Sequence, residues 1–195
     1  MSQYILENKQ LKVTVDSKGC EITSIVHKED NRECIWCGQE NIWKRHTPVL
    51  FPLVGRYKDD TSIYEGKEYK MSQHGFARDM EFELVEKSET RIEMSLSDTE
   101  VTREKYPFRF KLSIRYELVD EKVIVTWKVQ NMDEKSMYFS IGGHPAFVYG
   151  ETLSDAKIHF ETEKDEITYG LLNENGLLKR EKYTFQLDKE KNILV

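Results

Sequence analysis

The sequence of 195 residues lacks several features that mark common protein classes. It contains no apolar stretch that approaches the roughly 20 residues needed for a membrane-spanning helix. Its N-terminus, MSQYILENKQ, has neither the basic region nor the apolar region of a secretory signal peptide. We therefore expect a protein with no membrane partner that is located in the cytoplasm.

Cysteine is scarce, with only Cys20, Cys34 and Cys37. An odd number of cysteines suits a reducing compartment better than a disulfide framework. Together with His27 they could form a zinc site. However, Cys34 and Cys37 lie three apart around residues 32–36, which are typical of a strand, so alternation would point them to opposite faces. We favour buried or idle thiols and expect no metal site.

Proline and glycine are also sparse, and no segment rich in proline, glycine or serine divides the chain. Low-complexity tracts and internal repeats are missing as well. A single β-sandwich domain over residues 1–195 is the simplest prediction, and this length suffices to bury a hydrophobic core. The net charge of −6 gives no overall attraction to a phosphate backbone, so nucleic-acid binding is not expected.

Apolar residues alternate along much of the chain, which indicates half-buried β-strands. The clearest alternating runs are residues 11–15, 92–96, 110–118 and 123–129. A polar turn around Asp120 and Glu121 predicts a long antiparallel hairpin over residues 109–131. Strands and turns that recur about every ten residues favour an all-β sandwich or barrel over alternating β and α units.

Two further hairpin turns and one helix complete the expected secondary structure. The turns are predicted at residues 65–67 and 87–89. The helix is predicted over residues 99–105, with Asp98 as its N-cap, and it should end before Pro107. Because this helix is short, the expected fold class stays all-β.

Two stretches break the strand pattern and are rich in chemically active residues. Residues 46–79 contain HTPVLFPLVGR and QHGFARD, and residues 140–150 read SIGGHPAFVYG. Loops held by a rigid scaffold are where binding groups concentrate. In the second stretch, paired glycines and Pro145 place His144 at the end of a strand predicted over residues 137–141.

His144 is the best single catalytic candidate. An unperturbed imidazole titrates near pH ~6.5, so it can give or take a proton at neutral pH with little tuning. The competing interpretation is a histidine that only hydrogen-bonds a turn, and the local sequence alone leaves the two about equal.

QHGFARD places His74 beside Gly75, with Arg78 four residues after His74. The planar guanidinium group suits paired hydroxyls, a carboxylate or a phosphate. A surface pair between Arg78 and Asp79 is about equally compatible with the spacing. Arg56, at the end of FPLVGR, also follows a constrained turn, although this signal is weaker.

Four segments in this order, RHTPVLFPLVGR, QHGFARD, YPFRFKL and FSIGGHPAF, resemble the aldose 1-epimerase (galactose mutarotase-like) family, and most closely its LacX-type subgroup. The similarity covers nearly the whole chain, and four ordered motifs are far more specific than one. The resemblance implies a galactose mutarotase-like β-supersandwich with an open cleft for a pyranose. It also implies an isomerase that interconverts the α and β anomers of a hexopyranose, with a hexose or hexose phosphate as the small-molecule partner.

The resemblance also implies roles for the candidate residues. His144 matches the histidine that protonates the ring oxygen, His74 a substrate-positioning histidine, and Arg56 an arginine near the sugar. Arg78 matches an arginine that helps to bind the phosphate in relatives that act on hexose 6-phosphates. Aromatic residues near these loops could stack on sugar faces, although several should be core: Trp43, Phe51, Tyr57, Phe76 and Phe147. Ring opening needs one acid and one base, and no cofactor.

The family's base is a glutamate in a late apolar strand, and nothing after residue 156 matches it. The glutamates there lie in polar surroundings typical of solvated surface: Glu161, Glu163, Glu166, Glu174, Glu181 and Glu190. The chain also stops in an apolar run, residues 193–195, that is typical of a strand just beginning. We therefore expect a fold that is incomplete at the C-terminus, little or no activity in this chain alone, and open sheet edges that favour a homo-oligomer.

Three other functions stay open at this stage. A non-catalytic sugar-binding module would keep the cleft and lack the base. A hexose-6-phosphate mutarotase would use Arg56 or Arg78 for the phosphate, because either guanidinium can serve hydroxyls or a phosphate. A structural β-sandwich that works only through its surface predicts no stabilisation by any sugar.

Overall fold

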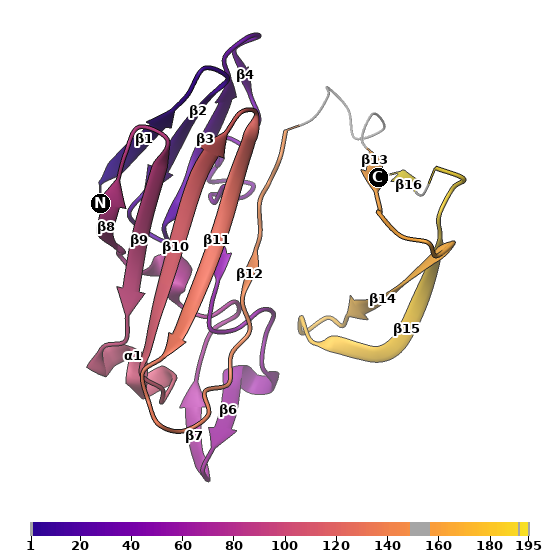
Figure 1. Ribbon diagram of the computed structural model, residues 1–195. Coiled ribbons are helices and arrows are strands. Elements are labelled where there is room, and N and C mark those ends of the chain that lie inside the picture. Colours follow the sequence, from indigo (N-terminus) through magenta and orange to yellow (C-terminus); the bar gives the residue numbers. More distant parts are fainter. Residues whose placement is uncertain (1, 149–156, 191, 195) are drawn as a thin grey trace. The chain divides into compact units, whose positions relative to one another are not determined.

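The computed structural model of the chain describes residues 2–148, 157–190 and 192–194. It divides into two compact units, Met1–Phe147 and Val148–Val195, and each is described by itself. Strands dominate both units (Figure 1), and the one α-helix within the described residues is six residues long. The all-β fold class is confirmed, while the single domain over residues 1–195 stays a prediction.

The first sheet of unit 1 contains four antiparallel strands that are neighbours in sequence order: β1 (Gln3–Glu7), β2 (Leu11–Asp16), β3 (Glu21–His27) and β4 (Arg32–Glu33). The alternating run at residues 11–15 lies in β2, with Leu11, Val13 and Val15 buried. The strand predicted over residues 32–36 is shorter than expected. It ends at Glu33, and Ile35 forms only an isolated bridge with Phe147.

The second sheet of unit 1 has the order β11-β10-β9-β8, with bounds β8 (Glu83–Lys87), β9 (Arg91–Ser97), β10 (Phe110–Val119) and β11 (Lys122–Asn131). The long hairpin over residues 109–131 and the turn at residues 87–89 are both confirmed.

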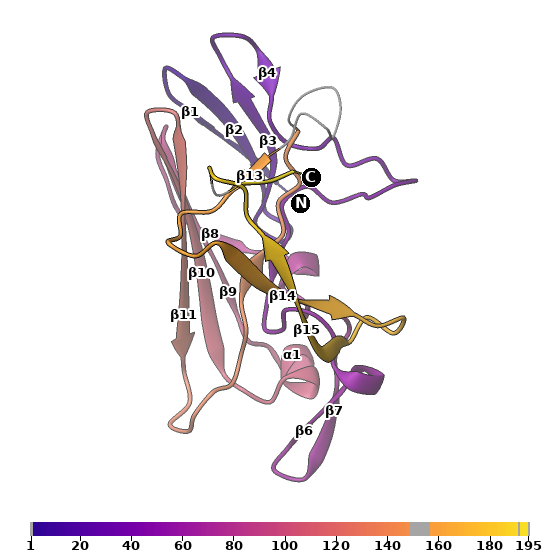
Figure 2. The same ribbon diagram turned by 90° about the vertical axis from the view of Figure 1, so that its right-hand side faces the viewer.

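The two four-stranded sheets form the layers of a sandwich, which Figure 2 shows edge-on. Their inner faces share one hydrophobic cluster, in which Leu6 and Val13 of the first sheet pack with Phe110 and Ile114 of the second. The hydroxyl of Tyr116 donates to the carbonyl of Cys20 at 2.6 Å across this interior. Burial of one large apolar side chain here contributes roughly 1.5–3 kcal/mol to the stability of the fold. The cluster therefore gives the loops that connect the strands a rigid support.

Shorter elements complete unit 1: β5 (Val49–Leu50), η1 (Lys58–Asp60), β6 (Thr61–Tyr64), β7 (Lys67–Lys70), η2 (Ala77–Asp79) and β12 (Gly142–Gly143). Strands β6 and β7 form the hairpin predicted around residues 65–67. The strand predicted over residues 137–141 was wrong, since the strand in this region is β12, which begins at Gly142. The carbonyl of Tyr138 instead accepts from the side chain of Tyr106, and the N–H of Ser140 donates to the carbonyl of Pro52.

Helix α1 (Glu100–Lys105) ends at Tyr106, before Pro107, as predicted. Its N-cap is Thr99, so the assignment of Asp98 was wrong by one residue. Thr99 and Thr102 form a reciprocal capping box, in which each hydroxyl accepts from the backbone N–H of the other. The carboxylate of Asp98 is used elsewhere, because it accepts from the N–H of Phe110 at 3.1 Å and pairs with Arg103.

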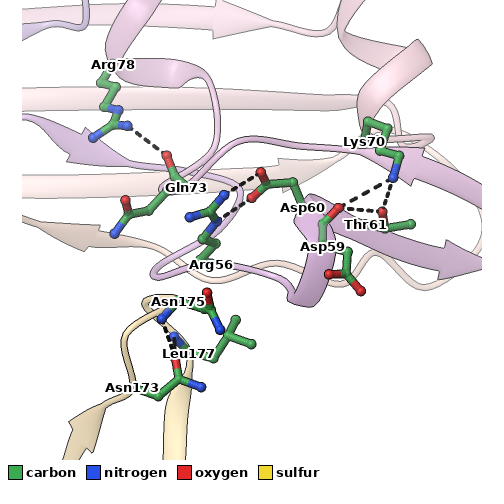
Figure 3. Close-up of polar contacts among 10 residues, drawn as sticks. All are labelled: Arg56, Asp59, Asp60, Thr61, Lys70, Gln73, Arg78, Asn173, Asn175 and Leu177. Atoms are coloured by element: carbon green, nitrogen blue, oxygen red, sulfur yellow. Dashed lines mark hydrogen bonds and ion pairs between the residues drawn. The ribbon is translucent and has the colours of Figure 1, made fainter.

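Unit 2 contains two antiparallel pairs, formed by β13 (Lys157–His159), β14 (Glu166–Leu172), β15 (Leu178–Gln186) and β16 (Asn192–Leu194). The turn between β14 and β15 is held by the side chain of Asn173, which accepts from the backbone N–H groups of Asn175 and Leu177 at 3.0 and 2.9 Å (Figure 3). The strand predicted at residues 193–195 corresponds to β16, except that Val195 lies outside the described residues.

Strands β1, β4, β8 and β11 stand at the ends of the two four-stranded sheets. Pairing of such edges between copies of the chain stays a prediction. Among the described residues no helix combines the length and the apolar character needed to cross a bilayer.

Candidate functional site

Residues 46–55 form a backbone segment, here named the spine, on which the candidate site is built. Residues 140–146 run antiparallel beside the spine in one continuous register. Strand β12 pairs with β5, and three further backbone bonds extend the pairing: Ser140 to Pro52, His144 to Pro48 and Ala146 to His46, at 2.9, 3.0 and 2.9 Å. The backbone position of His144 is therefore set by the spine.

The other side of the spine holds the turn that carries His74. The carbonyl of Phe51 accepts from the N–H groups of Phe76 and Ala77 at 3.0 and 3.1 Å. Gly75 bridges Phe51 directly and has φ +72°, and a Cβ there would lie 2.3 Å from the carbonyl oxygen of Phe51. Only glycine fits this close approach, so the GF pair in QHGFARD fixes His74 against the spine.

His74 is held in one orientation and one tautomer. Its backbone has φ +69°, and its N–H donates to the carbonyl of Gly55 at 2.8 Å. In return, the N–H of Gly55 donates to Nδ1 of the imidazole at 3.1 Å. Because Nδ1 accepts, Nε2 carries the proton of the neutral ring and is available as a donor to a ligand oxygen.

The surroundings of His74 keep this ring neutral. Burial lowers its pKa below 6.5, and the positive charges of Arg78, His144 and Arg45 lower it further. No carboxylate is among the groups that shift this pKa. His74 is therefore suited to orient a ligand through a hydrogen bond, and less suited to act as the acid.

The imidazole of His144 lies close to two other rings. Its centroid is 6.0 Å from the centroid of His74, in an edge-on arrangement, and 5.3 Å from that of Trp43. His144 is exposed although its backbone is anchored, so its ring can meet a ligand from solvent. Trp43 was one of five aromatic residues named from the sequence, and no sequence signal distinguishes it from the other four.

Arg56 lies next to Gly55, the residue that binds His74. Its guanidinium forms a two-pronged ion pair with Asp60, with N···O distances of 2.7 and 2.8 Å (Figure 3). This pairing raises the pKa of Arg56 and lowers that of Asp60. The structure thus places the backbone of Arg56 next to the residue that binds His74 and orients its guanidinium through Asp60, a partner that the sequence analysis did not identify.

Arg78 is part of η2 and is largely enclosed. Its Nη2 donates to the carbonyl of Gln73 at 2.7 Å (Figure 3), and within the described part of the chain its buried Nε has no hydrogen-bond partner. Burial and the nearby charge of Arg45 lower its pKa. The surface pair considered for Arg78 and Asp79 is loose, at 3.9 Å, because Asp79 binds Arg45 at 2.8 Å.

A small polar cavity of about 270 Å³ adjoins Arg78. Its charged lining consists of the cations Lys18, Lys44, Arg45 and Arg78 and the carboxylates Asp16, Glu21 and Asp79. The cations exceed the carboxylates, so this cavity suits an anionic group that also accepts hydrogen bonds.

A second cavity in unit 1, of about 690 Å³, is lined mostly by apolar side chains such as Ile22, Val125 and Trp127. Gly143 and Pro145 border it on either side of His144 in the sequence. Such a lining offers few donors for sugar hydroxyls. Neither of these two cavities is lined by His74 or His144, so a common cleft for His144, Arg56 and His74 stays a prediction.

Within the described residues, no group of three or more His, Cys, Asp and Glu side chains is placed to hold a metal ion. His27 instead pairs with Asp30 at 2.6 Å, and the buried Cys20 has its thiol pKa raised by burial. The six late glutamates are all exposed, as their polar surroundings predict: Glu161, Glu163, Glu166, Glu174, Glu181 and Glu190. Tyr149 and Gly150, at the end of SIGGHPAFVYG, lie outside the described residues.

Known proteins share both the sequence pattern and this architecture. A sequence profile of the aldose 1-epimerase family matches residues 2–193. The protein LacX (plasmid) of Lactococcus lactis subsp. lactis is 32% identical, over 96% of this chain and 66% of its own length. A galactose mutarotase related enzyme from Lactobacillus acidophilus is also 32% identical, with a TM-score of 0.92 over 100% of this chain and 65% of its own.

A galactose mutarotase-like protein from Lactobacillus casei is 30% identical, with a TM-score of 0.89 over 100% of this chain and 67% of its own. The fold is therefore galactose mutarotase-like, as the motifs predicted. The chain spans 66% of the length of the curated relatives it matches. On the match of the family profile to nearly every residue, the chain belongs to the aldose 1-epimerase family.

Proposed function

We propose that the chain binds a hexopyranose at His144, His74 and Arg56 and contributes the acid of a mutarotase that interconverts α and β anomers. The observation that carries this proposal is the pair of imidazoles 6.0 Å apart, anchored on opposite sides of one backbone segment. One ring is held neutral and oriented, while the other is exposed with a fixed backbone. This division suits one positioning group and one proton donor.

In this mechanism the protonated imidazole of His144 gives its proton to the ring oxygen of the sugar as the bond from C1 to that oxygen breaks. A base takes the proton of the C1 hydroxyl, which leaves an open-chain aldehyde. Rotation about the bond between C1 and C2 exposes the other face of the carbonyl, and the reverse proton transfers close the ring. Nε2–H of His74 and the guanidinium of Arg56 would hold hydroxyl oxygens in place during these steps.

The base is not assigned. No carboxylate shifts the pKa of His74, and the six late glutamates are exposed. General acid and general base assistance each contribute typically 10²–10⁴-fold. We therefore expect this chain to accelerate mutarotation only weakly. A longer protein, with a segment that corresponds to the third of its relatives that this chain does not cover, should accelerate mutarotation much more.

Polarimetry on fresh α-D-glucose and α-D-galactose tests the proposal, with the chain and its His144→Ala variant compared at equal folded concentration. Residual acceleration that is lost in His144→Ala supports the acid role. A fully active chain would show that one of its own carboxylates is the base. Equal rates in the two proteins at every concentration would reject His144 as the acid.

A hexose 6-phosphate is a second candidate substrate, and the polar cavity beside Arg78 favours it. The Nε of Arg78, which has no described partner, offers a hydrogen-bond donor to a phosphate. Lys44 and Arg45, which line the same cavity, add positive charge. Thermal shift with glucose and with glucose 6-phosphate separates the two substrates, because at equal concentration the ligand that binds the folded state more tightly stabilises it more. Stronger stabilisation by the phosphate ester, lost in Arg78→Gln, would favour the phosphorylated sugar.

A non-catalytic sugar-binding protein is the remaining candidate, since it would keep the two histidines without a base. It predicts stabilisation by sugars together with an unchanged rate of mutarotation, even in a longer protein. A panel of sugars that leaves the melting temperature unchanged would argue against any sugar site in this chain.

A further inference from the structure

Glu21 holds the beginning of the spine. It is the first residue of β3, and only 8% of its surface is exposed. Its Oε1 atom accepts from the backbone N–H of Thr47 at 2.8 Å and from that of His46. The hydroxyl of Thr47 adds a bond to the carbonyl of Ile22 at 2.8 Å. Residues 46 and 47 are thus tied to the beginning of β3 by three hydrogen bonds.

The same two-residue segment leads directly to His144. The carbonyl of His46 accepts from the N–H of Ala146 at 2.9 Å, and the carbonyl of Pro48 accepts from the N–H of His144 at 3.0 Å. Two hydrogen bonds therefore connect Glu21 to the loop of His144, one from the N–H of His46 to the Glu21 carboxylate and one from the N–H of Ala146 to the carbonyl of His46. A shift of residues 46 and 47 would move the carbonyls of His46 and Pro48, which bind the backbone N–H groups of Ala146 and His144.

The carboxylate of Glu21 is used for this task and not for an ordinary surface ion pair. Its nearest described cationic candidate is Nδ1 of His46, at 3.7 Å, which exceeds hydrogen-bond distance. A largely buried carboxylate is costly unless hydrogen bonds satisfy it, and bonds from backbone N–H groups to a charged oxygen are about twice as strong as neutral ones. Two such bonds on one oxygen make residues 46 and 47 a rigid point.

We propose that Glu21 is a positioning residue for His144, because its carboxylate fixes residues 46 and 47 and thereby the register of residues 140–146. Its part in catalysis rests on the proposed function, whereas the mechanical coupling does not. Glutamine can keep both bonds because they converge on a single oxygen, and alanine can keep neither. We therefore predict that Glu21→Ala loses amide protection at residues 144 and 146 and lowers kcat, whereas Glu21→Gln keeps both near their wild-type values.

Amide hydrogen exchange on the full 195-residue chain tests the coupling without any need for activity. In Glu21→Ala the amides of His144 and Ala146 should exchange roughly 10-fold faster or more, while the amide of Ile114 in β10 stays protected. Glu21→Gln should stay within a few-fold of the wild type. Glu93→Ala is the matched control, since Glu93 is also a strand glutamate whose side chain is only 18% exposed, bound to Arg115 at 2.8 Å.

Acceleration of mutarotation provides the second measurement. A displacement of the acid by about 1 Å can cost roughly 100-fold, so kcat should fall in Glu21→Ala with a smaller change in KM, and Glu21→Gln should recover it. Should Glu21→Ala not fold, Glu21→Asp takes its place, because its carboxylate is one methylene too short.

The two measurements separate the two ideas. Exchange that accelerates at residues 144 and 146 in a chain that neither catalyses mutarotation nor is stabilised by any sugar would reject the proposed function and keep the positioning role. Unchanged exchange at both amides in a folded Glu21→Ala variant would overturn the positioning role. An equally large increase in exchange at these two amides in Glu93→Ala would also overturn the positioning role, because the effect would then be general destabilisation.

Discussion

The two units of the chain have similar strand content and opposite degrees of burial. Unit 1 holds the entire described hydrophobic core, which both four-stranded sheets share. Unit 2 has two antiparallel pairs, and none of its residues with a described exposure is buried. Apolar side chains of β14 and β15, such as Tyr169, Leu172 and Phe185, are each more than a third exposed.

This difference shows that alternation alone does not make a stable sheet. A pair of strands without a second layer is marginal in water, because it buries too little apolar surface to offset the ordering of its backbone. Unit 1 buries enough apolar surface because its two sheets face each other, and the residues of its candidate site lie on the loops of that sandwich. We therefore expect unit 1 to unfold cooperatively and unit 2 to open at a much lower free energy.

The largest test of the comparison is the removal of one ring from each unit. Phe110 is fully buried, whereas Phe185 is 43% exposed. Phe110→Ala should lower the free energy of unfolding by about 3–5 kcal/mol, and Phe185→Ala by less than about 1 kcal/mol. Urea unfolding monitored by tryptophan fluorescence measures the first effect, because Trp36, Trp43 and Trp127 all belong to unit 1.

Equal losses for the two variants would contradict the comparison. They would show that the stability of β15 contributes to the same cooperative transition as the sandwich. A control for secondary effects is the urea dependence of the unfolding free energy, which should be the same in wild type and Phe185→Ala.

The sandwich could be predicted from the sequence because its signals are local and repeated. Alternating residues in β9, β10 and β11 each report burial of one face, and the turn at Asp120 sets the register of the hairpin. The errors lie where a tertiary contact replaces a local rule. The carboxylate of Asp98 binds the N–H of Phe110 and the side chain of Arg103 and caps no helix N–H, so Thr99 is the cap.

The site was predictable only in part. His74 and His144 could be named from glycine-rich motifs and from the family resemblance. Their common support on the spine could not, because it depends on tertiary hydrogen bonds such as those from His144 to Pro48 and from Phe76 to Phe51. Asp60 binds Arg56 only four residues away. The partners of Glu21 and Trp43, by contrast, are distant in sequence and are set by the fold. No periodicity or motif in one sequence reports such contacts.

The next test is a substitution at Gly75, which measures how strongly the turn of His74 depends on its close contact with Phe51 of the spine. Gly75→Ala places a Cβ 2.3 Å from the carbonyl of Phe51 in a backbone with φ +72°, so the turn or the spine must shift. We expect a loss of about 2–4 kcal/mol in unit 1, measured by urea unfolding. Gly66→Ala is the matched control, because Gly66 has φ +79° with nothing within 4 Å, and it should cost only about 1–2 kcal/mol.

Equal costs for Gly75→Ala and Gly66→Ala would mean that the contact with Phe51 adds no constraint. In that case the exact placement of His74 would not depend on the spine. The amide signals of residues 74 and 55 in the two variants locate any shift, since their mutual hydrogen bonds should be disturbed only by Gly75→Ala.

A smaller effect is expected from the protonation of His74. Folding lowers its pKa, chiefly through burial, so the unfolded chain binds this proton more readily. The corresponding stability is present above pH ~6.5 and is lost as the pH falls through the lowered pKa of the folded state. Unit 1 should therefore lose more stability between pH ~7.5 and pH ~5 in the wild type than in His74→Gln. Identical pH profiles would show that His74 does not titrate differently on folding.

The smallest expected effect lies in unit 2, where Tyr169 and Tyr183 face each other across β14 and β15 with ring centroids 5.8 Å apart. An exposed cross-strand pair of this kind contributes about 0.2–1 kcal/mol, and little else in the described hairpin is buried. A double-mutant cycle with Tyr169→Ala and Tyr183→Ala, followed by hydrogen exchange of the β14 and β15 amides, measures that coupling. The opening free energy of these amides should drop by the full pair energy, while the amides of β10 should not respond. A coupling well above this range, or a response in β10, would mean that the hairpin shares the cooperative transition of the sandwich, and the contrast between the two units would fail.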